Sequence, residues 1–375
     1  MTAASIATVD HPENRMAQHD ITTREALHEQ LYKALQLEHS TIPPYLTALY
    51  SIKPDTNRNC SLILREVVVE EMLHLAIAAN VLNAVGGRPN LTRPGFVANY
   101  PAPLSDGEDD FEVELRPFSE DLIKIFLQIE RPAMAEGQPK LTAKRAGVVS
   151  PMLPTPPGRP DCRYYSIGEF YKAILDGLAY LEDEARAAGK TIFVGDPHRQ
   201  VTSSAYYSAG GRLPVVTDLE SATKAIRFII GQGEGELQGV HDDDGELAHY
   251  YQFDQISRGR KYLPGDRPHA PSGVTFKVDY DDAYPVKPNI KLADYPPGSE
   301  LLHAARSFNE AYATFLAFLT TAFNGHPELM LETAVPDMFR FRDWINILVR
   351  NPLPGTEFHA GPTFEIDEIP SEDAG

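Results

Sequence analysis

Two stretches near the beginning of the chain have the apolar period of an α-helix, yet each carries ionisable side chains on its apolar stripe. The first predicted helix covers about residues 23–50 and places Glu38 in line with its leucines. The second covers about residues 61–85 and places Glu71 and His74 on its stripe in the same way. A buried carboxylate is costly unless it is paired or bound to a metal. These two helices are therefore predicted to meet around a polar site rather than around a purely apolar core.

The spacing of these side chains predicts what that site holds. In Glu71-x-x-His74 the carboxylate and the imidazole lie about one turn apart on one face of a helix and can converge on one ion. A single Glu-x-x-His is usually a surface feature. Helix-bundle di-iron proteins, however, use one Glu from each of two helices and Glu-x-x-His from each of two others.

The second half of the chain contains matching residues. Glu246-Leu-Ala-His249 repeats the spacing on a short helix predicted from about Gly245 to Ser257. Glu169 lies near the start of a third long helix, and Glu234 lies near the end of a fourth. Antiparallel packing would bring these two ends together. The predicted metal ligands are Glu38, Glu71, His74, Glu169, Glu234 and His249, with Glu246 ranked below them and Glu70 as an outer contact.

Oxygen and nitrogen donors without a thiolate favour iron or manganese, and this number of carboxylates favours two ions. We therefore expect two iron ions, with manganese or a mixed-metal pair as the alternative. No Gly-x-Gly-x-x-Gly or P-loop pattern indicates a nucleotide cofactor. The pattern identifies no catalytic or substrate-binding side chain beyond the predicted ligands.

Pro43 and Pro44 interrupt the first helical stripe shortly after Glu38. A proline removes a helical hydrogen bond and its ring clashes with the preceding turn. One interpretation is that the helix simply ends here. The other is that a kink opens a coordination position beside Glu38.

The remaining segments give a mainly α-helical fold, a four-helix bundle with a central insertion that contains loops and a strand and with additional C-terminal helices. The strand is predicted from the alternation in residues 111–115. The predicted helices not yet bounded cover about residues 119–129, 166–188, 217–237, 299–323 and 328–349. The predicted division is a flexible tail over residues 1–22 and a single domain over 23–370, with an insertion at about 88–161 and an extension at about 259–370.

The net charge of −19 argues against binding to nucleic acid or to anionic lipid, because both need a basic face. Cys60 and Cys162 are too few for a disulfide framework and are interpreted as free thiols. The first residues lack the apolar core of a signal peptide, and no apolar run reaches the roughly 20 residues of a membrane span. We therefore expect a cytoplasmic protein, and a homo-oligomer is compatible with the sequence.

Around the predicted ligands, the sequence resembles the ferritin-like domain of the iminophenyl-pyruvate dimer synthase family, which includes the large synthases of the violacein and rebeccamycin pathways. The resemblance spans roughly residues 25–365. Its motifs are Glu38-His-Ser-Thr-Ile-Pro-Pro-Tyr-Leu46, Glu70-Glu-Met-Leu-His-Leu75, Arg116-Pro-Phe-Ser119, Ile129-Glu-Arg-Pro132, Ser166-Ile-Gly-Glu-Phe-Tyr171, Gln232-Gly-Glu-Gly235, Glu246-Leu-Ala-His-Tyr-Tyr251 and Gly361-Pro-Thr-Phe-Glu365.

The resemblance implies a ferritin-like fold with a carboxylate-bridged metal centre, often in bacterial secondary metabolism. It leads us to expect an oxidase or oxygenase that acts with dioxygen on a small amino-acid-derived or aromatic substrate. The alternatives are a ferroxidase or other iron-handling protein, and a component of an imine-dimerising synthase, although those synthases are far longer than this chain. Several aromatic residues near the predicted ligands could line a substrate pocket or belong to the core: Tyr164, Tyr165, Phe170, Tyr250 and Tyr251.

Overall fold

The structure, a computed structural model, describes residues 21–103, 112–132, 166–206, 213–234, 239–242 and 245–366. It is mainly α-helical, as the sequence predicts. The helices are α2 (Arg24–Ser51), α3 (Arg58–Ala84), α4 (Glu120–Ile129), α5 (Ile167–Ala187), α6 (Leu219–Glu234), α7 (His249–Arg258), α8 (Glu300–Ala322) and α9 (Val335–Val349), the last preceded by the π-helical segment η4 (Met330–Ala334).

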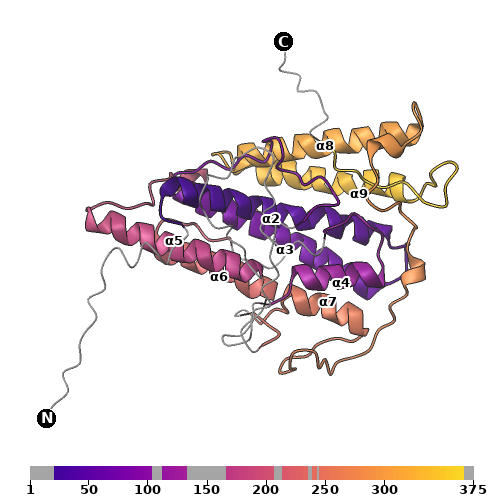
Figure 1. The fold of residues 1–375 in the computed structure, drawn as a ribbon, viewed down its shortest axis with the longest axis horizontal. Coiled ribbons are helices and arrows are strands. Elements are labelled where there is room, and N and C mark those ends of the chain that lie inside the picture. Colours follow the sequence, from indigo (N-terminus) through magenta and orange to yellow (C-terminus); the bar gives the residue numbers. More distant parts are fainter. Residues whose placement is uncertain are drawn as a thin grey trace, which may run out of the picture.

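The helices form three layers, with α2 and α3 in the middle (Figure 1). The helices α8 and α9 pack on each other and cover α2 from one side. On the other side lie two shorter pairs, α5 with α6 and α4 with α7, one after the other along the length of the central pair. Leu27, Leu31, Leu35 and Leu64 are fully buried at the core of this arrangement. Each contributes roughly 1.5–3 kcal/mol through the apolar surface removed from water.

This arrangement is a four-helix bundle whose third and fourth members are each interrupted. One long segment is divided into α4 and α5, and the other into α6 and α7 (Figure 1). The ends of these helices are consequently inside the bundle rather than at its rim. Side chains at the interruptions can therefore reach α2 and α3 at mid-length.

Serine and threonine side chains set where several helices begin. Ser119 accepts a hydrogen bond from the backbone N–H of Leu122 at the start of α4, and Ser166 accepts one from Glu169 at the start of α5. Such N-caps satisfy backbone donors that have no partner within the helix. The starts of α4 and α5 therefore follow from local sequence, and both agree with the prediction to within one residue.

The helix α2 continues through Pro43 and Pro44 to Ser51, close to the predicted range of about 23–50, so of the two interpretations the simple helix end after Glu38 is wrong. Because Pro44 has no N–H, the carbonyl of Ser40 loses its usual helical partner. The hydroxyl of Tyr100 donates to that carbonyl at 2.7 Å and replaces it. A residue far away in the sequence thus allows the helix to continue.

The helix α7 begins at His249 rather than near Gly245, so the prediction that Glu246 and His249 lie one turn apart on one helix is wrong. Residues 240–242 and 246–248 pair instead. His241 and Leu247 form an antiparallel bridge, and the N–H of Asp242 donates to the carbonyl of Glu246 at 2.8 Å. These bonds hold the preceding residues in a tight turn and delay the helix.

The strand predicted at residues 111–115 is reduced, within the described range from residue 112, to a single antiparallel bridge between Val113 and Ala102. None of the described helices is long and apolar enough to cross a membrane. The division into a tail, one domain, an insertion and an extension stays a prediction. Cys60 is a buried free thiol, whereas Cys162 lies outside the described residues.

Candidate metal centre

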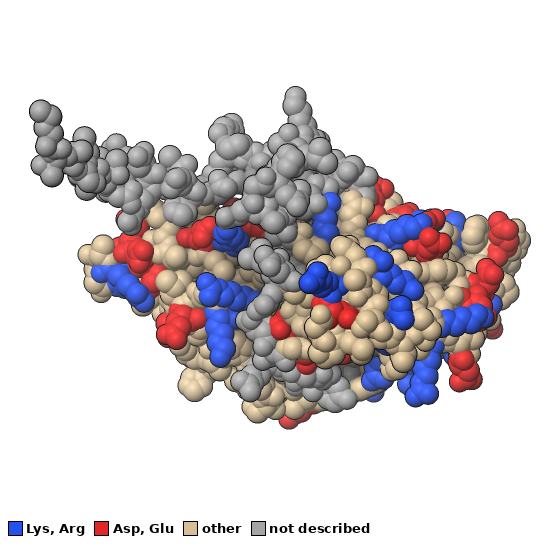
Figure 2. Space-filling view, turned by 90° about the horizontal axis from the view of Figure 1, so that it is seen from below, with Lys and Arg blue, Asp and Glu red and all other residues tan. Residues whose placement is uncertain are grey.

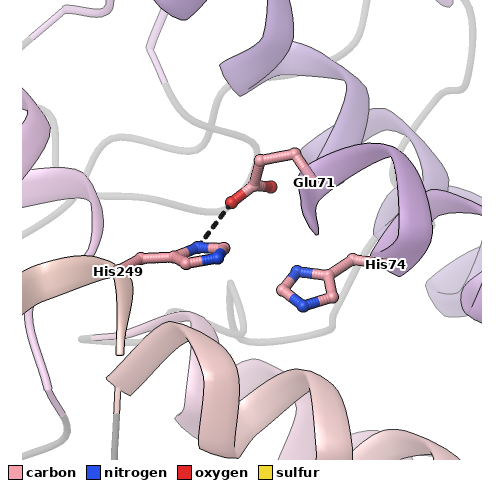
Figure 3. Close-up of side chains that lie close together, drawn as sticks. All are labelled: Glu71, His74 and His249. Carbon is pink, nitrogen blue, oxygen red and sulfur yellow. Dashed lines mark ion pairs between the residues drawn. The ribbon is translucent and has the colours of Figure 1, made fainter. Parts of the chain in front are cut away.

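Three buried side chains from two helices converge between the layers. Glu71 and His74 project from α3, and His249 projects toward them from the first turn of α7 (Figure 3). Each offers a possible ligand atom, and these atoms all lie within 4.8 Å of one another. The two imidazole rings stack with their centroids 5.3 Å apart. This group has the donor types and the spacing that a metal centre needs.

Both histidines turn Nδ1 toward carboxylates. Nδ1 of His74 lies 3.5 Å from Oε2 of Glu38, which projects from α2. Nδ1 of His249 lies 2.9 Å from Oε1 of Glu71 and 3.7 Å from Oε2 of Glu130, the residue that ends α4. Three carboxylates from three helices therefore surround the Nδ1 atoms of two imidazoles.

Two of these three carboxylates are held at their other oxygen by a tyrosine hydroxyl. Tyr171, in the second turn of α5, donates to Oε1 of Glu38. Tyr45 of α2 donates to Oε1 of Glu130 at 2.5 Å. Burial and the neighbouring carboxylate raise the pKa of each tyrosine well above its usual value, so both remain hydrogen-bond donors.

The third carboxylate is held by a threonine. Oγ1 of Thr41 lies 3.0 Å from Oε2 of Glu71 and 2.8 Å from the carbonyl oxygen of Glu38, and its single proton is shared between these two acceptors. All three carboxylates thus have one oxygen fixed by a hydroxyl, while the opposite oxygen faces an imidazole. A hydroxyl that orients a carboxylate in this way prepares the free oxygen for a ligand role.

The opposite nitrogen of each imidazole faces an outer acceptor. Nε2 of His74 lies 3.0 Å from Oε1 of Gln232, whose own amide nitrogen donates to Glu246. Nε2 of His249 lies 2.9 Å from Oε2 of Glu70. Because both partners are oxygens that accept, we assign the proton of each ring to Nε2. With Nε2 protonated, Nδ1 is the nitrogen that would give up its proton and offer its lone pair to a metal.

The carboxylates and imidazoles perturb one another strongly. Burial raises the pKa of Glu71 to about 7, and the charge of Glu130 adds to this effect. Burial lowers the pKa of His249, but the nearby carboxylates of Glu130, Glu70 and Glu71 together raise it well above its usual value. The pKa of His74 is likewise raised, because contact with Glu38 outweighs burial. Negative charge in this interior therefore attracts protons strongly, as it would attract metal cations.

One atom of the site lacks a partner that a metal could supply. Nδ1 of His249 is buried and has no hydrogen-bond partner, although Oε1 of Glu71 lies only 2.9 Å away. The two atoms approach each other without the alignment of a hydrogen bond. A buried polar atom without a partner is unusual and needs an explanation. A cation bound between the ring and the carboxylates would satisfy it, so the donor set fits a metal.

Four of the predicted ligands meet at this site: Glu38, Glu71, His74 and His249. Glu169 lies in the first turn of α5 and is half-buried, but it does not belong to the group of ligand atoms within 4.8 Å. The side chain of Glu234, the last residue of α6, lies outside what the structure describes. Glu246 lies in the turn before α7 with an exposed side chain, where it accepts a hydrogen bond from Gln232.

Sequence reasoning missed Glu130 and Gln232. Glu130 is only 3% exposed, and Gln232 is equally buried, a strong sign of a role for a polar side chain. Glu130 follows the last apolar residue of a short helix, and only the fold shows that this helix end points inward. Both residues occur within family motifs, which was the available signal.

A cleft of about 660 Å³ runs beside α6. One of its lining residues, Gly231, directly precedes Gln232 in the sequence. The basic side chains of Lys224 and Arg227 are exposed along it, near the ring of Phe228. The lining residues are Arg186, Leu219, Glu220, Thr223, Lys224, Arg227, Phe228, Gly231 and Asp242. On the face drawn in Figure 2, basic and acidic side chains of the described residues are interspersed.

A family model described as ferritin-like matches residues 31–258, the part of the chain that runs from α2 to α7 and contributes every residue of the site. The chain belongs to the ferritin-like family. Its ferritin-like fold agrees with a solved structure, that of a ferritin-like protein from Caulobacter vibrioides. The two share 23% sequence identity with a TM-score of 0.56, over 87% of this chain and 95% of that one. At this identity the likeness concerns the fold alone.

Dichlorochromopyrrolate synthase from Lentzea aerocolonigenes is 29% identical to this ferritin-like chain over 328 residues. The matched region covers 81% of this chain but only 30% of the synthase, so the chain spans less than a third of that relative. The resemblance that the sequence motifs indicate is therefore confirmed.

Proposed function

We propose that this ferritin-like chain is a non-haem di-metal oxidoreductase that uses dioxygen to oxidise a small organic substrate. The observation that carries the proposal is the common orientation of the two buried imidazoles. His74 and His249 both direct Nδ1 toward carboxylates and Nε2 toward an outer oxygen. Such an arrangement suits metal coordination, because the outer hydrogen bond selects the tautomer and fixes the ring.

The proposed ligands divide into two groups. Glu38 with His74 would hold one ion, and Glu130 with His249 would hold the other. Glu71 lies next to His249 and on the same helix face as His74, so it could be a ligand of both ions. Glu169 and Glu234 remain candidate ligands from the sequence. Two iron ions are the expected occupants, with manganese or a mixed pair as the alternative, because the donors are oxygen and nitrogen without thiolate.

When bound, the ions would supply the redox chemistry with dioxygen. The protein would hold the ligand side chains in place and keep water out of the site. Tyr171, Tyr45 and Thr41 hold the carboxylates so that their free oxygens face inward. The ligand side chains are nearly inaccessible to solvent, which strengthens electrostatic interactions among them. These residues would thus hold the metals without rearranging.

The cleft beside α6 supports a particular class of substrate. Lys224 and Arg227 present positive charge near the ring of Phe228, a combination that suits an aromatic or amino-acid-derived carboxylate. The relative that is a dichlorochromopyrrolate synthase supports a role in secondary metabolism. Because this chain spans only 30% of that relative, we propose oxidation of a single substrate rather than the complete synthase reaction.

The experiment is anaerobic iron loading followed by oxygen consumption with candidate aromatic carboxylates. We expect about two iron ions per chain and oxygen uptake that rises when a substrate is present. The variant Arg227→Ala should raise the KM for a carboxylate substrate without changing the amount of iron bound. Absence of stoichiometric metal would reject the proposal. Storage of many irons, with no organic compound changing oxygen uptake, would favour the ferroxidase alternative.

A further inference from the structure

Charged side chains of α6 line the cleft without forming ion pairs among the described residues. Glu220 and Lys224 are four residues apart with the acid first, a spacing that favours pairing along a helix, yet they do not pair. Arg227, further along α6, is likewise without an ion pair in the described chain. The same spacing does give ion pairs on α4, α5 and α7: Glu120 with Lys124, Glu182 with Arg186, and Asp254 with Arg258. Lys224 and Arg227 therefore keep their charges available to a ligand in the cleft.

Asp242 adds a carboxylate to the lining of the same cleft. A Cβ atom built on Gly231 would lie 3.6 Å from the Cβ of Asp242, so Asp242 stands beside α6 at Gly231. Gly231 follows Arg227 by four residues, which puts these two positions about 5–6 Å apart on one face of the helix. The backbone N–H of Glu246 donates to Oδ1 of Asp242 at 2.8 Å and fixes the carboxylate. The cleft therefore presents a cation and an anion about one helical turn apart.

An aromatic ring accompanies these charges. Phe228 directly follows Arg227 in the sequence, is half-buried and lines the cleft. Aromatic rings attract one another in offset or edge-on contacts, so Phe228 favours a ligand that carries a ring of its own. The volume of about 660 Å³ is within the range of roughly 300–1,000 Å³ that small-molecule sites occupy. The cleft thus has room for a small aromatic molecule with two opposite charges.

We propose that this cleft binds the substrate as an intact α-amino acid with an aromatic side chain, its carboxylate on Arg227 and its ammonium group on Asp242. The inference rests on the proposed function and deepens it, because it adds recognition of an ammonium group to that of a carboxylate. A guanidinium group can hold a carboxylate through two parallel hydrogen bonds, and a carboxylate accepts charge-assisted bonds from an ammonium group.

The charge of the whole chain favours the same class of ligand. The net charge is −19, so a free carboxylate anion is repelled before it reaches the cleft. An α-amino acid carries no net charge and escapes this repulsion. Its two charged groups are attached to a single carbon, which suits a cation and an anion that lie about one turn apart on a helix.

The test measures ligand binding by isothermal titration calorimetry on the full chain, without metal and after anaerobic iron loading, so that no turnover is required. The probes are L-phenylalanine and L-tryptophan, each compared with its analogue that lacks the ammonium group, 3-phenylpropionate or indole-3-propionate. The variants are Arg227→Gln and Asp242→Asn. The matched control is Glu220→Gln, which removes a negative charge from the same cleft roughly 16 Å along α6 from Gly231.

We expect the wild-type protein to bind an amino acid about ten-fold more tightly than its analogue, because the ammonium group adds a charge-assisted hydrogen bond. Asp242→Asn should remove most of that preference. Arg227→Gln should weaken the amino acid and the analogue alike, by about ten-fold, and Glu220→Gln should change neither. A preference that Asp242→Asn leaves intact, or that Glu220→Gln removes to the same extent, would overturn the assignment of Asp242.

Two results would separate the cleft from the metal centre. Selective binding of amino acids by a protein that holds no stoichiometric iron would reject the oxidoreductase and keep the cleft as an amino-acid site. Equal binding of amino acid and analogue, in a protein that holds two irons and consumes oxygen faster with substrate, would reject recognition of the ammonium group and keep the oxidoreductase. If none of the probes bound with iron or without it, the cleft would not be the site of an aromatic amino acid.

Discussion

Histidines are buried to the same depth on both sides of α2, but carboxylates surround them on only one side. His39 faces α8, where Nε2 meets the hydroxyl of Tyr312 at 2.7 Å and the ring lies 4.9 Å from that of Phe96. Without a neighbouring carboxylate, burial lowers the pKa of His39 to about 3. On the other side, His74 and His249 lie among carboxylates that raise their pKa values. Burial by itself therefore does not identify a metal ligand, whereas carboxylates around a buried ring do.

The largest expected effect, on metal binding, distinguishes His74 and His249 from His39. His74→Ala and His249→Ala should each abolish tight metal binding, because each removes a proposed donor to the metal. His39→Ala should destabilise the fold by leaving a cavity but should retain the metal. Elemental analysis after anaerobic loading, together with thermal unfolding, measures both quantities. If His39→Ala abolished metal binding while His74→Ala did not, the metal would lie on the other side of α2 from the one proposed.

A second experiment examines the carboxylate that sequence reasoning missed. Glu130→Gln should reduce the bound metal from about two ions to about one, because Glu130 faces only His249. The matched control is Glu182→Gln. Glu182 is equally buried but is paired with Arg186 and Thr191 at the far end of α5. The ratio of metal to protein is the measurement, and an unchanged ratio in Glu130→Gln would remove Glu130 from the ligand set.

The two sides of α2 should also respond to pH in opposite directions. The folded-state pKa of Glu71 is about 7, above its ordinary value of 4.5, so its contribution to stability is complete at low pH and is lost as pH rises through about 7. The pKa of His39 is lowered from 6.5 to about 3, so its contribution is present above about pH 6.5 and is lost as pH falls toward 3.

Between about pH 4.5 and pH 7 the metal-free protein should consequently lose the stabilisation that Glu71 provides, and Glu71→Gln should remove that part of the pH dependence of Tm. His39→Phe should reduce the loss of Tm on the acid side instead. Added metal should raise the Tm more at the higher pH, because it replaces protons on the ligands. Thermal unfolding across this range is the measurement. A Tm difference between the wild-type protein and Glu71→Gln that stays constant from about pH 4.5 to pH 7 would contradict the assignment for Glu71.

The smallest expected effect comes from a pair of matched hydroxyl deletions. Tyr171→Phe removes the donor to Glu38 and should weaken metal binding by about ten-fold or more, as loss of an orienting contact does. Tyr312→Phe removes the partner of His39 and should cost about 1–3 kcal/mol of stability without affecting the metal. Metal titration and denaturant unfolding measure the two outcomes. An equal loss of metal affinity in both variants would show that the two sides are coupled.

Local pattern was enough to predict most of the helices and four of the residues in the site. The period of apolar residues is a property of neighbouring positions, so it revealed α2, α3, α5 and α8 with nearly correct ends. Glu38, Glu71 and His74 were recognisable because a charged side chain on an apolar stripe needs a reason. The Glu-x-x-His spacing pointed to His249, although the residue lies at a helix start and not within a helix.

What the tertiary structure alone decided depends on residues that meet from far apart in the chain. The tyrosine that holds Glu130 is 85 positions away from it, and Gln232 reaches His74 across 158 positions. The passage of α2 through its prolines likewise depends on the hydroxyl of Tyr100, 60 positions from its acceptor. The sequence by itself therefore identified Glu38, Glu71 and His74 as charged side chains on buried helix faces. The folded chain decided which of them meet, because only the interrupted helices bring the ends of α4, α6 and α7 to one place.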